Sequence, residues 1–489
     1  MGNHNTHSQL LKDNHEINDK VTRLYLYGID LLNLSEFINN LINLRILYCK
    51  HNKLTKLPET LCDLINLQQL VCSENNIINL PESIDKLTNL RELDISFNKL
   101  INLSESIGKL INLQQLNCTN NVLSNLPESI GTLINLRNFY CSFNKLIKIP
   151  ETITNLVNLQ YFYCNNNELT YFPENFDKLV NLHTLSCSVN KLTEFTESFY
   201  NLINLTDLDC DGNKLLNIPE TIGNLINLQH ITCRCNSLIT LPKNICKLIK
   251  LKSLDCSRNN LVKIPKIICE LINLQYLNCS DNKLTILPKF LNKLINLKYI
   301  YCSNNQLIEI PETICDIINL HGIQCECNKL KKLPNNLYNL INLKWLMCSE
   351  NEITKLSEKI GNLINLQQLY CSNNKLTKLP VSIINLKNLI EIDYDKQIKL
   401  SINLQRFIER IGHNIINNVH NISIHTSLID SINNLLSDTI EIKYNIIDDN
   451  ILDSKTKSIL YNFIEDKTIG EILINFEELL VYILEKIDN

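Results

Sequence analysis

A period of 23 residues is the feature that most constrains how this chain can fold. An asparagine recurs at that spacing through most of the sequence, with no insertion or deletion between copies. A fixed period of this length is typical of proteins that stack one structural unit many times. The fifteen residues that mark the phase are Asn52, Asn75, Asn98, Asn121, Asn144, Asn167, Asn190, Asn213, Asn236, Asn259, Asn282, Asn305, Asn328, Asn351 and Asn374.

Each copy begins as a short strand and continues as a return segment. Before Asn98, Leu93 and Ile95 alternate with polar residues, which is the two-residue period of a strand with one buried face. After Asn98, apolar residues follow at spacings of three or four, which indicates a short helical or irregular segment. One copy cannot bury its own leucines, but stacked copies can. The sequence therefore predicts a continuous core between a parallel sheet and the return segments.

The copies fit the pattern L-x-x-L-x-L-x-x-N-x-L, followed by L-P-x-x-I, from about residue 21 to 397. The chain therefore resembles the leucine-rich repeat family, most of all its Ras-group intracellular members with 23-residue repeats. The resemblance implies an α/β repeat solenoid, a horseshoe with a parallel sheet on its concave face and short helical or irregular segments on its convex side. It also implies a non-enzymatic protein-binding scaffold. Small GTPases, other signalling proteins and ubiquitin-pathway proteins are the partner classes it suggests.

The repeated asparagine and proline both have structural explanations. Where the chain leaves a strand, its backbone groups lose their sheet partners, and an asparagine amide can satisfy such groups in two adjacent copies. We therefore expect a ladder of asparagines. All twelve prolines occupy one position of the repeat, because a fixed φ and a missing N–H suit the start of a return segment. Ser104, Thr196 and Ser357 stand there in other copies and are expected to act as caps.

Cysteine usage bears on the cellular compartment. Fourteen of the twenty cysteines lie three residues before a ladder asparagine, at an inward strand position that Ile95 fills in one copy. Free cysteine can serve there as a small hydrophobic residue, and parallel side chains on neighbouring strands are poorly placed for disulfides. We therefore expect reduced thiols in a reducing, cytoplasmic compartment. The pairs Cys233 and Cys235, and Cys325 and Cys327, lack zinc-site spacing, so no metal is expected.

Three regions are predicted along the chain. Residues 1–20 form a polar, disordered tail, residues 21–397 the solenoid, and residues 398–489 a small, mainly helical C-terminal domain. The solenoid comprises a degenerate first unit, fifteen regular repeats and a partial last unit. The first six residues match the myristoylation pattern, so Gly2 is a candidate lipidation site, with an unmodified tail as the alternative. No run of residues is long and apolar enough to predict a transmembrane segment.

Within residues 398–489, apolar spacing predicts helices around residues 402–411, 429–436 and 472–484. This region is expected to cap the solenoid, to bind a partner, or to do both. It also gives rise to a second hypothesis about function. In that hypothesis the repeats select a target, and residues 398–489 carry or recruit an enzymatic activity in a signalling or ubiquitin pathway.

The sequence itself carries no enzyme signature. A phosphate-binding loop, a nucleophile elbow, a zinc-protease motif and a kinase motif set are all missing, and the chain has only ten glycines. We therefore expect neither enzymatic activity nor a cofactor. Function is instead expected on the concave face of the solenoid.

Residues six, four and two before each ladder asparagine alternate with the buried positions, so we expect them to be exposed on that face. Exposed tyrosine and tryptophan often anchor protein interfaces, although tyrosines can also pair across strands without binding a partner. The aromatic candidates for partner binding are Tyr140, Tyr161 and Tyr163 in one cluster, and Tyr276, Tyr299, Tyr301, Trp345 and Tyr370 in another.

An acidic cluster lies between these two groups. Asp207, Asp209 and Asp211 point the same way from one predicted strand, with about 6.7 Å between successive residues, so they repel one another unless a basic group faces them. A basic segment of a partner protein would supply that group. A solvated acidic face and a bound cation are the alternatives. The net charge of −4 argues against nucleic acid as a partner.

Overall fold

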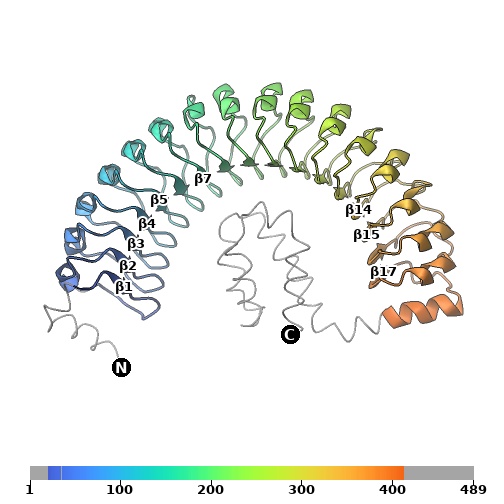
Figure 1. The fold of residues 1–489 in the computed structure, drawn as a ribbon, viewed down its shortest axis with the longest axis horizontal. Coiled ribbons are helices and arrows are strands. Elements are labelled where there is room, and N and C mark those ends of the chain that lie inside the picture. Colours follow the sequence, from blue (N-terminus) through green and yellow to red (C-terminus); the bar gives the residue numbers. More distant parts are fainter. Residues whose placement is uncertain (1–19, 35, 412–489) are drawn as a thin grey trace. The chain divides into compact units, whose positions relative to one another are not determined.

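The computed structural model describes residues 20–34 and 36–411. These residues form seventeen short strands that alternate with sixteen 3-10 helices along the chain. The chain divides into two compact units, of which unit 1 ends at Thr206 and unit 2 begins at Asp207. Within each unit the strands lie on the inner side of a curve and the helices on the outer side (Figure 1). The predicted repeat solenoid with a parallel inner sheet is therefore confirmed.

In unit 1 each strand pairs in parallel with the next, so every strand residue lies beside the residue 23 positions later. The strands are β1 (Arg23–Tyr25), β2 (Ile46–Tyr48), β3 (Gln69–Val71), β4 (Glu92–Asp94), β5 (Gln115–Asn117), β6 (Asn138–Tyr140), β7 (Tyr161–Tyr163) and β8 (Thr184–Ser186). The 3-10 helices are η1 (Glu36–Asn40), η2 (Glu59–Asp63), η3 (Glu82–Lys86), η4 (Glu105–Lys109), η5 (Glu128–Thr132), η6 (Glu151–Asn155), η7 (Phe176–Lys178) and η8 (Glu197–Asn201).

Unit 2 repeats this arrangement with the same parallel register of 23 residues. Its strands are β9 (Asp207–Asp209), β10 (His230–Thr232), β11 (Ser253–Asp255), β12 (Tyr276–Asn278), β13 (Tyr299–Tyr301), β14 (Gly322–Gln324), β15 (Trp345–Met347), β16 (Gln368–Tyr370) and β17 (Glu391–Asp393). Its 3-10 helices are η9 (Glu220–Asn224), η10 (Lys243–Lys247), η11 (Lys266–Glu270), η12 (Leu291–Lys293), η13 (Glu312–Asp316), η14 (Leu337–Asn339), η15 (Glu358–Asn362) and η16 (Val381–Asn385).

The asparagine ladder has the form that the sequence predicts, as Asn167 illustrates. Its Oδ1 accepts a hydrogen bond from the backbone N–H of Leu146 at 3.0 Å. Its Nδ2 donates to the carbonyl oxygens of Cys141 and Cys164 at 3.0 and 3.1 Å. The amide thereby joins its own copy to the preceding one. The residue before the ladder asparagine turns the chain with a positive φ, as Val189 does at 50°.

The inward cysteines are buried, as predicted, and all twenty cysteines of the chain are free in the structure. Their thiols also contact carbonyl oxygens of the next strand. The distance is 3.4 Å from Cys118 Sγ to the oxygen of Tyr140 and 3.3 Å from Cys302 Sγ to that of Gln324. Cysteine therefore combines an apolar body with a weak donor at this position. Burial raises the pKa of Cys279 to about 12, which keeps this thiol protonated and unreactive.

In several copies the glutamate that follows the repeat proline (or the serine in its place) caps the helix of the next copy. The carboxylate of Glu59 accepts hydrogen bonds from the backbone N–H groups of Glu82 and Ser83 at 2.9 and 3.2 Å. The contact has no local sequence signal, because it joins residues 23 and 24 positions apart. The same contact is made by Glu105, Glu220, Glu312 and Glu358.

Two of the three predicted hydroxyl caps are present. Ser104 and Ser357 each accept a hydrogen bond from a backbone N–H two residues later, at 3.2 Å. Thr196 makes no such bond, so the prediction was wrong there. Its hydroxyl instead lies 3.2 Å from the hydroxyl of Ser198, which removes it from the backbone donor.

A helix covers residues 402–411, as predicted, and it buries Leu404, Phe407 and Ile411. The other two predicted C-terminal helices and Gly2 lie outside the described residues, so the roles suggested for them stay predictions. Among the residues that the structure describes, no helix has the length and apolar character needed to cross a membrane.

Candidate partner-binding face

The inner face exposes fewer positions than predicted. The residue two before each ladder asparagine is buried in most copies, where it is usually serine or threonine. Because neighbouring strands lie only about 4.8 Å apart, these short side chains cover one another. Asp211 occupies this position and is only 7% exposed, so its predicted exposure is wrong. The residues six and four before the asparagine are half-buried in most copies of unit 2.

Arg234, one copy later, is the basic group that faces Asp211. Its Nε lies 3.0 Å from Oδ2 of Asp211, and its backbone N–H donates a hydrogen bond to Oδ1 at 2.7 Å. Burial raises the pKa of Asp211 well above its usual range, the carboxylates of Asp209 and Asp255 add to the rise, and the Arg234 guanidinium opposes it. Asp211 therefore has an internal partner. Arg234 could have been identified from the sequence, because it lies 23 residues after Asp211 and is therefore its neighbour in the parallel register.

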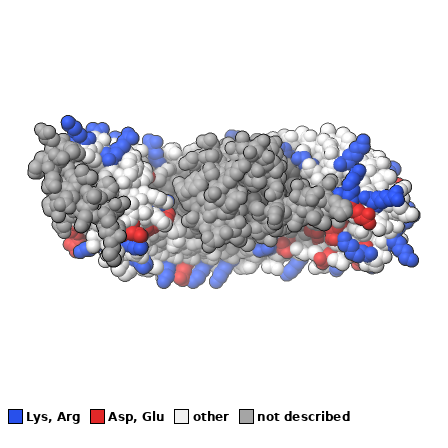
Figure 2. Space-filling view, turned by 90° about the horizontal axis from the view of Figure 1, so that it is seen from below, with Lys and Arg blue, Asp and Glu red and all other residues white. Residues whose placement is uncertain are grey.

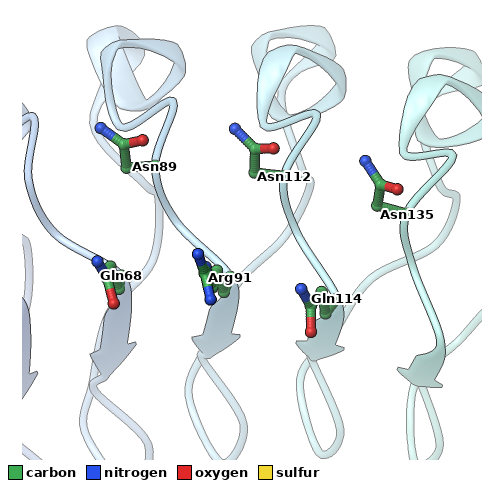
Figure 3. Close-up of a pocket in the computed structure, with 6 residues that line it drawn as sticks. All are labelled: Gln68, Asn89, Arg91, Asn112, Gln114 and Asn135. Atoms are coloured by element: carbon green, nitrogen blue, oxygen red, sulfur yellow. The ribbon is translucent and has the colours of Figure 1, made fainter.

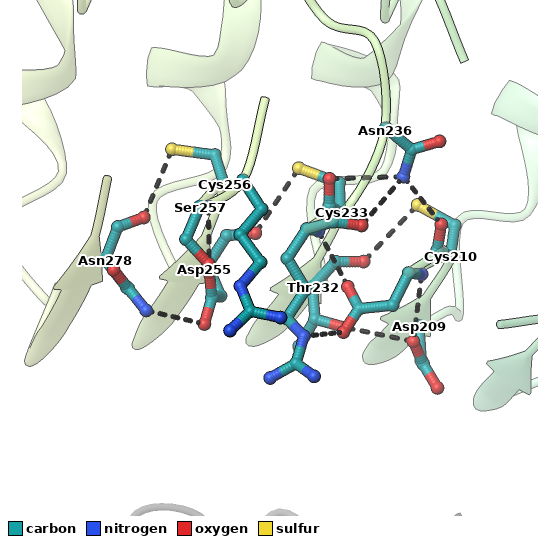
Figure 4. A network of polar contacts seen from close by, with 12 residues as sticks. Asp209, Cys210, Thr232, Cys233, Asn236, Asp255, Cys256, Ser257 and Asn278 are labelled. Atoms are coloured by element: carbon teal, nitrogen blue, oxygen red, sulfur yellow. Dashed lines mark hydrogen bonds and ion pairs between the residues drawn. The ribbon is translucent and has the colours of Figure 1, made fainter. Parts of the chain in front are cut away.

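The neighbouring carboxylates belong to the same polar network, which crosses several strands (Figure 4). Asp209 accepts a hydrogen bond from the Thr232 hydroxyl at 3.0 Å. Asp255 accepts bonds from the N–H and hydroxyl of Ser257 at 2.9 and 2.6 Å, and from the amide of Asn278 at 3.0 Å. These oxygens are held by the chain's own donors.

Asp207 begins β9 and lies beside His230 of β10 in the parallel register. Both residues are half-buried, and burial lowers the pKa of His230, so its imidazole is mostly neutral at pH 7. Asp207, Asp209 and Asp211 thus have three different surroundings. They do not form the single exposed acidic patch that their alternation predicted.

The second aromatic cluster is assembled around a glycine. Tyr299 of β13 and Trp345 of β15 stack with their ring centroids 5.4 Å apart, although β14 lies between their strands. Gly322 stands between them in the register, and a Cβ there would lie 3.0 Å from each ring. Tyr276 and Tyr301 form a second ring contact at 5.2 Å. Gly322 was not among the predicted site residues. Its signal in the sequence is a glycine at an inner strand position that carries a side chain in every other copy.

Carboxylates lie next to this aromatic cluster. Glu391 and Asp393 belong to β17, and Glu391 accepts a hydrogen bond from Gln368 of β16 at 3.0 Å. Burial and the nearby Glu391 raise the pKa of Tyr370. Burial also raises the pKa of Glu326, which follows β14. From β13 to β17 the inner positions include no lysine or arginine. Figure 2 shows acidic side chains at this end of unit 2, with basic ones along its edges.

The first aromatic cluster, in unit 1, is less accessible than predicted. Tyr140 and Tyr163 lie beside each other in the register and stack with centroids 5.3 Å apart. Tyr163 is buried by this packing, which corrects its predicted exposure, whereas Tyr161 is exposed. Cross-strand pairing accounts for Tyr140 and Tyr163, and their role in partner binding stays a prediction.

Parallel strands in a 23-residue register, 3-10 return helices and an asparagine ladder define a repeat solenoid whose inner residues can vary without changing the frame. The chain belongs to the leucine-rich repeat family. A model described as a leucine-rich repeat region matches residues 24–149, and a two-copy leucine-rich repeat model matches residues 272–315. A single-repeat model matches residues 204–225, 250–271 and 365–386.

Solved structures of similar fold come from bacteria and plants. A leucine-rich repeat protein of Leptospira interrogans is 33% identical, with 79% of this chain and 98% of that chain covered and a TM-score of 0.74. A plant peptide hormone receptor, solved in a complex, is 27% identical over 78% of this chain and 69% of its own, with a TM-score of 0.66. A leucine-rich effector protein of Yersinia pestis is 25% identical over 77% and 89%, with a TM-score of 0.57. No curated protein matches the chain.

Proposed function

We propose that the chain is a non-enzymatic protein-binding scaffold whose inner face in unit 2 receives a partner segment that carries arginine or lysine. The observation that carries this proposal is the Tyr299–Trp345 stack, which lies near Glu391 and Asp393 on a stretch of inner face without basic residues. Tyr276, Tyr301 and Tyr370 extend the same surface. Asp211 and Asp209 are held by partners within the repeats, so we assign them a structural role and not a role in partner binding.

The chemistry of this surface suits a cationic side chain. A guanidinium or ammonium group is attracted to the face of tryptophan or tyrosine, and the attraction is worth roughly 0.5 to 2 kcal/mol, depending on desolvation. Nearby carboxylates add charge complementarity and fix the register of the partner. Tryptophan and tyrosine are also the residues that most often dominate binding energy in protein interfaces. A plant peptide hormone receptor has a similar fold, which supports a peptide-like partner.

The narrower elements of the proposal rest on the sequence. A small GTPase or another signalling protein is the partner class suggested by the resemblance to Ras-group repeats. A cytoplasmic, reducing location would suit the free inner thiols. The division into a tail, a solenoid and a helical domain from residue 398 belongs to the same proposal. The alternative, in which residues 398–489 carry or recruit an enzymatic activity, concerns residues that lie mostly outside the described range.

The chain contains a single tryptophan, Trp345, so its fluorescence reports directly on this site. We expect an oligoarginine peptide to change the emission of Trp345 in the full chain, and an oligoglutamate peptide of equal length to leave it unchanged. In affinity capture, Trp345→Ala should lose the specific partner that the wild type retains, while Tyr161→Ala in unit 1 should keep it. Equal capture by both variants, together with unchanged fluorescence, would refute the proposal.

A further inference from the structure

A row of exposed aliphatic side chains runs along one flank of each unit. Its members lie ten residues before the ladder asparagines, between the 3-10 helix and the following strand. In unit 1 they are 44–57% exposed. They are Ile42, Ile65, Ile111, Ile134, Val157, Val180 and Ile203, with Thr88 in the remaining copy. Unit 2 carries a matching row of Ile226, Ile249, Ile272, Ile295, Ile318, Ile341 and Ile364. We call these residues the apolar row.

A second asparagine ladder holds this flank in place. The residue after each member of the apolar row is asparagine in nearly every copy, and its amide bonds to the carbonyl oxygen of the apolar row one copy earlier. Asn135 donates to Ile111 at 2.9 Å, for example, and Asn158 donates to Ile134 at 2.8 Å. The backbone under the apolar row is therefore fixed by the fold, and so the exposure of these side chains is built into every copy.

A basic row lies beside the apolar row, seven residues before the ladder asparagines. In unit 1 arginine occupies it in alternate copies, as Arg45, Arg91 and Arg137, with glutamine between them. None of these three side chains forms an ion pair within the described residues. In unit 2, Lys252, Lys298 and Lys344 occupy this row in alternate copies, with Gln275 and His321 between them. Although the chain contains 51 acidic residues, none lies in the stretch from ten to seven residues before a ladder asparagine.

The basic row and the second asparagine ladder line a polar cavity in unit 1 (Figure 3). Its volume is about 300 Å³, and Arg91 stands at its strand side. Amide side chains line the rest of it, namely Gln68, Asn89, Asn112, Gln114 and Asn135. A cation surrounded by amide donors, next to exposed isoleucines, suits an anionic headgroup attached to an apolar chain.

Two observations narrow down the occupant. A second copy of the chain would bring the same cations and no carboxylates to the contact, so charge opposes pairing of two such flanks. A protein partner normally selects different side chains along its footprint, as the varied inner face does, whereas the apolar row offers isoleucine or valine in nearly every copy. A uniform apolar row with basic groups recurring beside it matches a partner that is itself laterally uniform.

We infer that this flank is a peripheral membrane-docking surface, which places the apolar row at the headgroup boundary of an anionic lipid bilayer and the basic row among its phosphates. The inference is independent of the inner face and of the proposed protein partner. It also does not depend on the candidate acylation of Gly2, which the Gly2→Ala background of the test prevents.

The test is co-sedimentation of the full chain with vesicles, in a Gly2→Ala background, at low and moderate salt. We expect binding to vesicles of phosphatidylcholine with about one-third phosphatidylserine, and weak binding to pure phosphatidylcholine. The apolar variant combines Ile65→Thr, Ile111→Thr and Ile134→Thr, which copy Thr88. It should weaken binding by at least about tenfold. Its matched control combines Ile78→Thr, Ile101→Thr and Ile147→Thr, which are equally apolar but lie three residues after ladder asparagines, and should bind like the parent.

A charge variant with Arg45→Gln, Arg91→Gln and Arg137→Gln, which copies the glutamines of the other copies, should remove most of the salt-sensitive binding. Lys99→Gln, Lys145→Gln and Lys148→Gln give the control of equal charge. The inference is overturned if the parent does not bind anionic vesicles at low salt, or if the apolar variant and its control bind alike. Binding that depends on the arginines but not on the isoleucines would indicate a soluble polyanion instead. Thermal unfolding of each variant checks that the fold is retained.

Discussion

The indole ring of Trp345 stacks on the phenol ring of Tyr299 across an intervening strand, with centroids 5.4 Å apart. The contact exists because residue 322, in the same register between them, is glycine. Any other side chain there would separate the two rings.

Gly322→Ala tests this arrangement. The added methyl group would lie 3.0 Å from each ring, so the rings must part, but both are only half-buried and can move. We expect the emission of Trp345 to shift and oligoarginine binding to weaken, with a change of less than about 1 kcal/mol in the free energy of unfolding. Gly361→Ala is the contrast, because its Cβ would lie 2.6 Å from the backbone oxygen of Ser382. It should destabilise the chain by about 1 to 3 kcal/mol. Unchanged emission in Gly322→Ala would contradict the role of this glycine.

The two asparagine ladders should differ in their contribution to stability. Asn167→Ala leaves the buried N–H of Leu146 and the carbonyls of Cys141 and Cys164 without their amide partner. We expect a loss of at least about 3 kcal/mol, since each unsatisfied buried group costs about 1 to 3 kcal/mol. Asn158→Ala removes one exposed bond, which water can replace, and should cost less than about 1 kcal/mol. Urea unfolding measures both, and equal losses would show that the burial of the ladder is not decisive.

Val189 is expected to be a poor residue for its position. Its φ of 50° lies in the left-handed region, which is unfavourable for a β-branched side chain, whereas asparagine tolerates it. Asparagine stands at the same position of the repeat at Asn120 and Asn166. Val189→Asn should therefore raise the free energy of unfolding by about 1 kcal/mol, and Asn166→Val should lower it by a similar amount. Denaturation midpoints that move in the opposite sense would argue against backbone strain there.

Because Asp94 is partly buried, we expect the stability of the chain to depend on pH. Burial raises its pKa in the folded state, against the hydrogen bonds from Ser96 that lower it. The folded chain thus holds the proton more tightly than the unfolded chain, whose aspartates titrate near pH 3.9. The stabilising effect of that proton is complete below about pH 4 and is lost as pH rises through the folded pKa.

Asp94→Asn should therefore flatten the fall in unfolding free energy as pH rises above about 4, and it should stabilise the chain at neutral pH. Asparagine fits the position, because Asn117 occupies it one copy later and accepts the same kind of backbone bond, from Thr119 at 3.1 Å. Asp63→Asn on the exposed outer side is the control. A slope as steep in Asp94→Asn as in the parent would show that another group titrates.

The repeat architecture was predictable, because the residues that determine it recur at fixed positions of the period. The ladder asparagines, the apolar strand positions and the inward cysteines each keep one place in the 23-residue period, so a single copy gives the local structure and its repetition gives the stacking. The parallel sheet, the asparagine ladder and the buried thiols follow from that pattern. The glutamates that cap the helix of the next copy were visible in the sequence. Their partners were not, since a capping bond to the next copy leaves no local signal.

The candidate site was predictable only in part, since its chemistry depends on residues one or two copies away. Alternation placed Asp211 on the inner face but could not show that stacked neighbours bury it and that Arg234 pairs with it. Nor could it show that Gly322 brings Tyr299 and Trp345 together. The sequence alone determined the period, the register and the residues that fill the core, because each copy repeats the same local rules. Only the tertiary structure decided which polar and aromatic side chains meet, because stacking puts residues 23 and 46 positions apart into contact.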